Sequence, residues 1–310
     1  MHDRHATAGG GGTPATQLST TSPIILAGEA AYQAARRQKR NATLLGLVIL
    51  GLCLLLSARI SEAYPATLLA GLPRIGEYFS RILPGLRWDS LLAGTETEGS
   101  LAFWMYRLDS WAWLLLETAN MAALATLMGA GAAVLLAFPA ARNLGAGRIL
   151  CPAARRLLEA MRTVPEIVFA LILVWAFGVG PLAGILAIAL HTAGACGKLF
   201  AEAIENTGLG AWAGVRSAGG TWMQACRFAI LPQVAPNLLS YALLRFEINL
   251  RSASVIGFVG AGGIGEELYK VIAFNYYEEI SAILLLVILA VCAIDLLSER
   301  LRHRVIGAMA

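Results

Sequence analysis

Five polar side chains that fall inside largely apolar stretches of the chain are candidates for chemistry. They are His191, Arg245, Glu247, Asn249 and Arg251. A charged group at bilayer depth costs several kcal/mol unless it is paired or wetted, so residues of this kind are functional candidates. An arginine presents a planar fork of donors that matches an oxyanion. The set therefore predicts a place where a small anion can be bound and released.

Two interpretations of Arg251 stay open. It lies 19 residues after Pro232, deep in an apolar run, and Glu247 precedes it by four residues, one helical turn. In the first interpretation Arg251, with Arg245 one to two turns earlier, offers donors to an anion in transit. In the second, Glu247 and Arg251 form a structural ion pair.

Two other polar residues favour structural roles. His191 is the one histidine of the apolar region, and a lone histidine of this kind is more often a hydrogen-bonded packing residue than a ligand. Glu166 follows Pro165 at the start of an apolar run, where a carboxylate complements the N-terminal end of a helix. We therefore expect Glu166 to cap a helix.

A glycine-rich run at residues 260–265 and the cysteines exclude two further kinds of site. The run follows an apolar helix rather than a strand and lacks a following Lys-Ser/Thr, so it does not predict a nucleotide-binding loop. Close helix packing or bending at an outer gate fits it better. The five cysteines are scattered singly and predict neither disulfides nor a metal site. The candidate gate residues are Gly260, Gly262, Gly263 and Gly265.

The elements that position these residues are predicted to be membrane-spanning helices. The 310 residues are 57% hydrophobic and 14% charged, and the basic residues lie between apolar runs, which argues against nucleic-acid binding. Apolar runs of about 18 or more residues suit a hydrocarbon core about 30 Å thick. The fold class is therefore an all-α membrane protein of about six spans, near residues 42–58, 111–138, 164–179, 182–200, 237–259 and 279–297.

The remaining segments complete the predicted organisation. Residues 1–41 form a tail, 42–304 the transmembrane domain and 305–310 a short C-terminal tail. Basic residues 36–40 before the first run resemble a signal peptide, but the cleavage context is weak, so we expect an uncleaved span. Residues 59–110 contain several prolines and predict interfacial helices, and the tryptophans in and just after them predict an aromatic belt: Trp88, Trp104, Trp111 and Trp113.

Charge orients this arrangement. The N-terminal tail, the loops 139–163 and 198–236, and the C-terminus hold 16 of the 24 Lys and Arg, whereas 59–110 and 260–278 hold six, with an excess of acidic residues. The positive-inside rule then places both termini in the cytoplasm of a multi-pass inner-membrane protein.

The segment 201–236 has the pattern of two short helices across a membrane surface. A small-residue patch allows close approach of a partner, a glycine pair breaks the helix, and a second amphipathic segment ends at Leu231-Pro232, where a new helix begins. The residues concerned are Gly214, Arg216, Ser217, Ala218, Gly219, Gly220, Leu231 and Pro232.

The spacing from Gly219 to Leu231-Pro232 resembles the EAA loop of ABC-importer permeases, a type I importer fold. In that family a short helix of the loop seats in a groove of the ATPase subunit. The family's acidic first position falls on Ala213 here, so a salt bridge made by that acid elsewhere should be absent.

A second set of motifs resembles the phosphonate-importer permease and its phosphite and hypophosphite relatives. The resemblance implies a permease acting as a homodimer with two ATPase subunits, which bind ATP and Mg, and a periplasmic binding protein that delivers a small oxyanion. The motifs are Glu166-Ile-Val-Phe-Ala, 179–184, His191-Thr, Lys198-Leu, Leu231-Pro-Gln, Arg245-Phe-Glu247, 249–254 and 260–265.

Alternatives from other classes fit less well. No Walker-type phosphate loop occurs, so energy must come from a separate ATPase. HExxH and GxSxG motifs are also absent from the sequence, so we do not expect an enzyme. An ion-driven secondary transporter, or a permease for another small solute such as an amino acid, remains the alternative.

Overall fold

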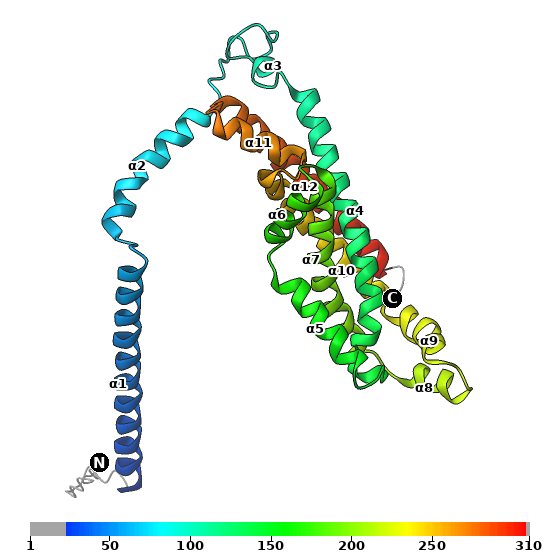
Figure 1. Cartoon of the computed structure of the whole chain (residues 1–310). Coiled ribbons are helices and arrows are strands. Elements are labelled where there is room, and N and C mark those ends of the chain that lie inside the picture. The colour runs from blue at the N-terminus through cyan, green and yellow to red at the C-terminus, as the bar shows by residue number, and fades with distance from the viewer. Residues whose placement is uncertain (1–22, 308–310) are drawn as a thin grey trace, which may run out of the picture. The chain divides into compact units, whose positions relative to one another are not determined.

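The computed structural model describes residues 23–307, and within that range the chain forms helices and no strands (Figure 1). This confirms the predicted all-α class. The chain divides into two compact units, Met1–Gly76 and Glu77–Ala310. Each unit is considered separately.

The first unit consists of one long helix and most of a second. α1 (Pro23–Ile60) passes through basic residues 36–40 before the apolar run predicted as the first span. α2 (Pro65–Ile82) follows, with Pro73 inside it. The tail predicted for residues 1–41 is thus helical from Pro23 on, because its Ala, Gln, Arg and Lys residues are good helix formers that extend the apolar helix. Residues 1–22 lie outside the described residues.

Three long helices form the centre of the second unit. α4 (Leu108–Ala140) packs against α7 (Pro181–Glu205), and α10 (Leu231–Ile256) packs against both. α6 (Glu166–Phe177) lies along α7, and α12 (Tyr277–Gly307) lies along α10 and runs into the C-terminal tail predicted for residues 305–310. The packing of these helices brings the predicted site residues on α6, α7 and α10 close together.

Glycines set the closeness of this packing. A Cβ on Gly129 of α4 would lie 2.7 Å from the carbonyl oxygen of Ala189 on α7. α5 (Leu150–Thr163) meets α7 in the same way, because a Cβ on Gly194 would lie 2.6 Å from the backbone nitrogen of Arg162. Small residues at helix interfaces let backbones approach where no apolar driving force acts between helices.

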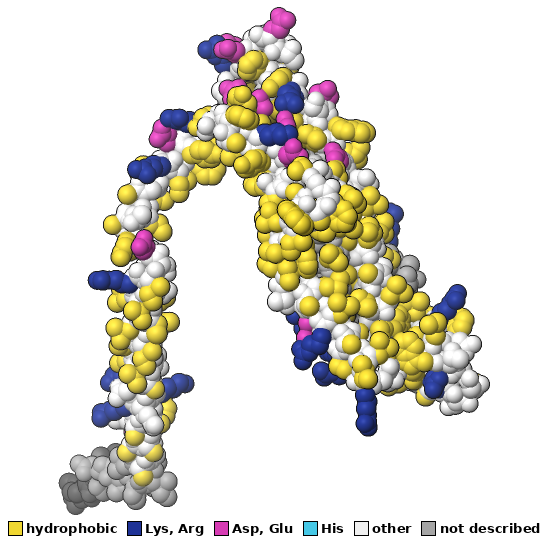
Figure 2. Space-filling view, in the orientation of Figure 1, with side chains coloured by type: hydrophobic (Ala, Val, Ile, Leu, Met, Phe, Trp, Pro, Cys, Tyr) yellow, Lys and Arg dark blue, Asp and Glu magenta, His cyan; other side chains and the backbone are white. Residues whose placement is uncertain are grey.

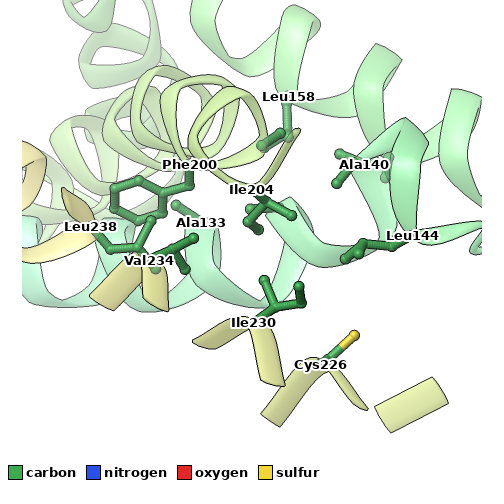
Figure 3. Close-up of a cluster of buried hydrophobic side chains, with 14 of the residues drawn as sticks. Ala133, Ala140, Leu144, Leu158, Phe200, Ile204, Cys226, Ile230, Val234 and Leu238 are labelled. Atoms are coloured by element: carbon green, nitrogen blue, oxygen red, sulfur yellow. The ribbon is translucent and has the colours of Figure 1, made fainter. Parts of the chain in front are cut away.

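Large apolar side chains fill the core at the end of the unit near α8 and α9 (Figure 3). Phe200 and Ile204 of α7 meet Val234 of α10 there, with Leu158 of α5 and Ile230 closing the cluster. All five are at most 2% exposed. Close packing of these side chains holds the start of α10 against α5 and α7.

Helices occupy all six predicted spans, and four of them are long and apolar enough to cross a membrane: 27–60, 108–140, 181–205 and 277–302. α6 has only 12 residues because Pro165 separates it from α5, and Val164 before it is extended. α10 is long enough but carries Arg245, Glu247 and Arg251. The count of six spans therefore stays a prediction.

Three short helices connect to the ends of the long ones. α3 (Leu101–Trp104) precedes α4, whereas η3 (Gly257–Val259) and α11 (Gly263–Ala273) lie between α10 and α12. Trp111, which the sequence places in an aromatic belt, is fully buried against Ile264 and Ile283. That prediction is wrong for Trp111, because α11 and α12 cover it.

Charged side chains in the second unit gather at its two ends (Figure 2). Hydrophobic side chains cover the middle of the unit, acidic ones gather where α3 and α11 lie, and mostly basic ones lie beyond α5. An apolar band between two polar ends is what a bilayer requires.

Candidate functional site

Arg245, His191 and Glu166 meet at the junction of α10, α7 and α6. Arg245 donates from Nη2 to Nδ1 of His191 over 2.6 Å and from Nε to Oγ1 of Thr192 over 3.4 Å. Oε2 of Glu166 lies 3.8 Å from Nη2 of Arg245 and 3.7 Å from Nδ1 of His191. Their side chains are between 13% and 24% exposed. The cluster is therefore mostly buried, and its guanidinium is paired but not hydrogen-bonded to the carboxylate.

The contact with Arg245 fixes the state of His191. A guanidinium has donors only, so Nδ1 accepts the hydrogen bond, and the ring is neutral with its proton on Nε2. His191 thus links α7 to α10 and orients Arg245.

Glu166 lies in the first turn of α6, where a carboxylate complements the N-terminal end of the helix as predicted. It makes no cap hydrogen bond, because the N-cap is Pro165 and no described side chain caps the helix there. The carboxylate turns instead towards Arg245 and His191, whose polar atoms share the same buried space. Oε2 of Glu166 is buried and has no hydrogen-bond partner among residues 23–307. A buried acceptor without a donor is costly, so this oxygen is a strong place for a ligand donor.

Asn249 lies one turn beyond Arg245 but faces protein on every side. Its amide nitrogen donates to Thr126 of α4 over 2.8 Å and to Thr192 of α7 over 2.9 Å. The residue is 0% exposed. The predicted pathway role of Asn249 is therefore corrected to an interhelical one, because its amide satisfies two buried hydroxyls.

The predicted Glu247–Arg251 pair within α10 is replaced by two pairs with α12. Glu247 binds Arg302 over 2.5 Å, and Arg251 binds Asp295 over 3.3 Å. Residues four apart share a helix face, and here that face meets α12, which carries opposite charges within reach. Arg251 and Asp295 have 54% and 38% of their side chains exposed. The single chain therefore leaves this charged pair open on one side.

The glycine-rich run is packed against three helices. Gly260, Gly262 and Gly263 have φ between +71° and +84°, which side chains rarely adopt. A Cβ on Gly265 would lie 1.9 Å from the carbonyl oxygen of Ser254, and the backbone nitrogen of Ile264 donates to Thr118 over 2.9 Å. Close packing explains these glycines, and the predicted gate role stays a prediction.

Residues 201–236 form the expected short helices, α8 (Gly210–Ser217) and α9 (Trp222–Ala225). Gly219, at φ +85°, ends α8: its nitrogen donates to Arg216, and that of Gly220 donates to Val215. A new helix, α10, begins at Leu231 with Pro232 in its first turn, as predicted, and the missing N–H of this proline breaks no hydrogen bond of α10. No loop precedes it, because α9 leads through the π-helical turn η2 (Cys226–Ile230) directly into α10.

One face of this coupling segment (residues 209–230) is open while the other is anchored. Trp222 donates from its indole to the carbonyl oxygen of Leu144, in the turn η1 (Arg142–Leu144) after α4. Met223 and Phe228 are 72% and 65% exposed, and the small residues Gly214, Ser217 and Ala218 are exposed as well. An exposed apolar surface on a rigid support is suited to a protein partner.

Comparison with known proteins identifies the family to which this chain belongs. Residues 120–308 match the family described as binding-protein-dependent transport system inner membrane component. The chain belongs to this family. It is accordingly a permease subunit of an ABC importer, a multi-pass membrane protein and not an enzyme; ATP is hydrolysed by a separate subunit.

The permease is similar to several characterised importer proteins. It is 37% identical over 255 residues to the phosphite transport system permease protein PtxC of Stutzerimonas stutzeri, covering 82% of this chain and 86% of that one. It is 39% identical over 190 residues to the phosphate-import permease protein PhnE of Mycolicibacterium smegmatis, covering 61% of this chain and 36% of that one.

Solved structures agree on the fold. A chain of the inward-facing MetNI methionine ABC transporter has a TM-score of 0.53 at 21% identity, covering 63% of the permease and 95% of that chain. A chain of a bacterial ABC transporter for the polysaccharide alginate also gives 0.53, at 14% identity, covering 79% and 95%. These likenesses confirm the type I importer permease fold.

Sequence reasoning missed the partners that α12 and α4 supply. Asp295 and Arg302 were not singled out, although Asp295 interrupts an apolar run, which is a usable signal. Thr192 was part of the His191-Thr motif but no role was predicted for it, and Thr126 gave no signal, because only the packing shows which hydroxyls meet Asn249.

Proposed function

We propose that the permease forms the membrane pathway for phosphite or a phosphonate in an ATP-driven importer. The observation that carries this is the similarity to the phosphite permease, which extends over 82% of the chain. A guanidinium and a histidine held inside the helical layer supply the donor chemistry that an oxyanion needs. Permeases for hypophosphite or another small solute are the alternatives.

The test is uptake by the assembled importer. The permease, its ATPase and its periplasmic binding protein are reconstituted in liposomes, and uptake of phosphite, methylphosphonate, hypophosphite and methionine is measured with and without ATP. We expect ATP-dependent uptake of phosphite or methylphosphonate. Uptake of methionine alone would refute the substrate class, and uptake without ATP would favour an ion-driven transporter.

The ATPase contact is proposed to be the coupling segment. Its exposed small residues and apolar side chains support this, and Gly214 offers a clean probe because a Cβ there meets nothing within 4 Å. Gly214→Trp should leave the permease folded but abolish copurification of the ATPase. Gly71→Trp, at an equally open helical glycine on α2, is the control. Normal copurification of the Gly214 variant would contradict the assignment.

A second copy of the chain is proposed to cover the open side of the Arg251–Asp295 pair. Charged side chains that are 54% and 38% exposed cannot face lipid without a cost of several kcal/mol. A homodimer whose interface includes this part of α10 and α12 removes that cost and encloses a pathway between the copies. Two ATPase subunits, holding ATP and Mg, would then meet the two coupling segments.

The outer end of the second unit offers a place for the binding protein. A pocket of about 660 Å³ there is lined by Trp104, Tyr106, Tyr276, Glu278 and Glu279, among others. The hydroxyl of Tyr106 donates to Glu279 over 2.7 Å, which raises the pKa of this tyrosine. Aromatic rings beside carboxylates attract cationic side chains. This supports docking of a partner with a basic surface.

A further inference from the structure

We infer that Glu166 and Arg245 form a transit site for an oxyanion that carries both a P–O⁻ and a P–OH group. The inference rests on the proposed function and names the chemical form that the permease selects. It follows from two neighbouring groups that have hydrogen bonds still to make: the N–H donors of Arg245 and the acceptor oxygen of Glu166.

Arg245 keeps donors free. Its Nη2 serves His191 and its Nε serves Thr192, whereas Nη1 makes no hydrogen bond to any described residue. The His191 ring that holds the guanidinium is neutral, so the positive charge of the cluster is that of Arg245 alone. An anionic P–O⁻ group can therefore accept from Nη1 while the contact with His191 keeps the fork oriented.

Glu166 lacks a donor at the same place. Its buried Oε2 lies 3.7 Å and 3.8 Å from the nearest nitrogens of His191 and Arg245, beyond hydrogen-bond range, and makes no hydrogen bond. Both lone pairs of that oxygen can accept. An anion with a hydroxyl group can donate a hydrogen bond to this oxygen. An anion without a hydroxyl group cannot, and the carboxylate then only repels it.

This requirement separates substrates that differ little in size. The monoanions of phosphite and of alkylphosphonates each carry one P–OH beside P–O⁻, so they satisfy both residues. Hypophosphite is also a monoanion, but its two remaining positions are P–H bonds, and it has no hydroxyl. The site should therefore accept phosphite and phosphonates and disfavour hypophosphite. The carboxylate beside the guanidinium also keeps binding weak, as passage requires.

Weak binding can be observed directly on the permease. The permease–ATPase complex in nanodiscs, without binding protein, is mixed with millimolar phosphite, methylphosphonate or hypophosphite at a mildly acidic pH where the monoanions dominate, and ³¹P line broadening is recorded. The wild type should bind phosphite and methylphosphonate at least about tenfold more tightly than hypophosphite, the effect expected of one hydrogen bond to a charged acceptor.

Variants assign that preference to the two residues. Glu166→Gln should reduce the preference for phosphite over hypophosphite to near unity, because the neutral amide can donate to a P–O⁻ group as well as accept from a P–OH group. Arg245→Ala should remove broadening of all three anions. Glu202→Gln, on α7 with an exposed partner in Lys198, is the matched control and should behave as wild type.

The outcomes separate this inference from the proposed function. Equal binding of phosphite and hypophosphite by the wild type, no binding of either, or an unchanged preference in Glu166→Gln would each overturn the transit site. If Glu166→Gln does not assemble, the wild-type preference still decides. Failure of wild-type liposomes to take up any phosphorus oxyanion would instead refute the proposed function.

Discussion

Arg251 and Asp295 carry opposite charges on the neighbouring helices α10 and α12. Each lowers the free-energy cost of the other's charge within the membrane. Arg251→Ala or Asp295→Ala alone should therefore lower the melting temperature of the purified permease, whereas the double alanine variant should lose less than the sum. Arg156→Ala on α5 is the control, because the Arg156–Glu159 pair is largely exposed and surface pairs contribute little. Additive losses would show that the two charges do not interact.

The same double variant tests the remaining role of Arg251. If the residue serves only Asp295, restoring assembly by removing both charges should restore uptake as well. Assembly without uptake would show that Arg251 also contacts the transported anion. Thermal unfolding and liposome uptake, measured on one preparation, distinguish the two results.

Cys226 gives a residue-level test of packing at the start of α10. Burial raises the pKa of this thiol from 9.0 to about 11, so its reactive thiolate is about a hundredfold scarcer than usual below pH 9. Alkylation by iodoacetamide, followed by mass spectrometry, should be slow at pH 8 and rise mainly above pH 10. Partly exposed Cys151 is the internal reference, and equal rates at pH 8 would contradict the packing.

Residue types were predictable here, but their partners were not. Arg245, His191 and Glu166 stand out because each is polar within or beside an apolar run. Their meeting depends on how α6, α7 and α10 cross, which no local pattern encodes. The Glu247–Arg251 prediction failed for the same reason: spacing defines a shared helix face, and only tertiary packing decides what faces it.

Helix packing in this permease depends on glycines that the sequence pattern does not distinguish from others. Gly194 on α7 leaves no room for a Cβ beside the backbone of Arg162, whereas Gly131 on α4 has open space. Gly194→Ala should thus lower the melting temperature by several degrees by separating α5 from α7, although alanine is the better helix former. Gly131→Ala should be neutral or slightly stabilising. Equal behaviour of the two variants would show that α5 does not pack as described.

Element positions followed from hydrophobic runs, and element ends followed from glycine and proline. The end of α8 at Gly219 and the start of α7 at Pro181 are of this kind. The continuous passage from α9 through η2 into α10 was not predictable, because Pro232 signals a helix start whether or not a helix precedes it. That continuity places the coupling segment and Arg245 on one uninterrupted run of helix.

Orientation is a property of the whole molecule, because it depends on charges summed over segments far apart in the chain. The segments predicted to be cytoplasmic hold 16 Lys and Arg and the opposite ones six, and this bias is what the positive-inside rule uses. In a cysteine-free permease in intact cells or spheroplasts, Glu96→Cys should react with a membrane-impermeant maleimide from the periplasmic side. Arg148→Cys, in the loop before α5, should react only after the membrane is permeabilised or in inverted vesicles. Both positions lie outside the site and the coupling segment, so neither change should affect uptake, which serves as the control for correct insertion. Labelling of position 96 from the cytoplasmic side alone would overturn the six-span arrangement, since that side must receive the coupling segment and its ATPase.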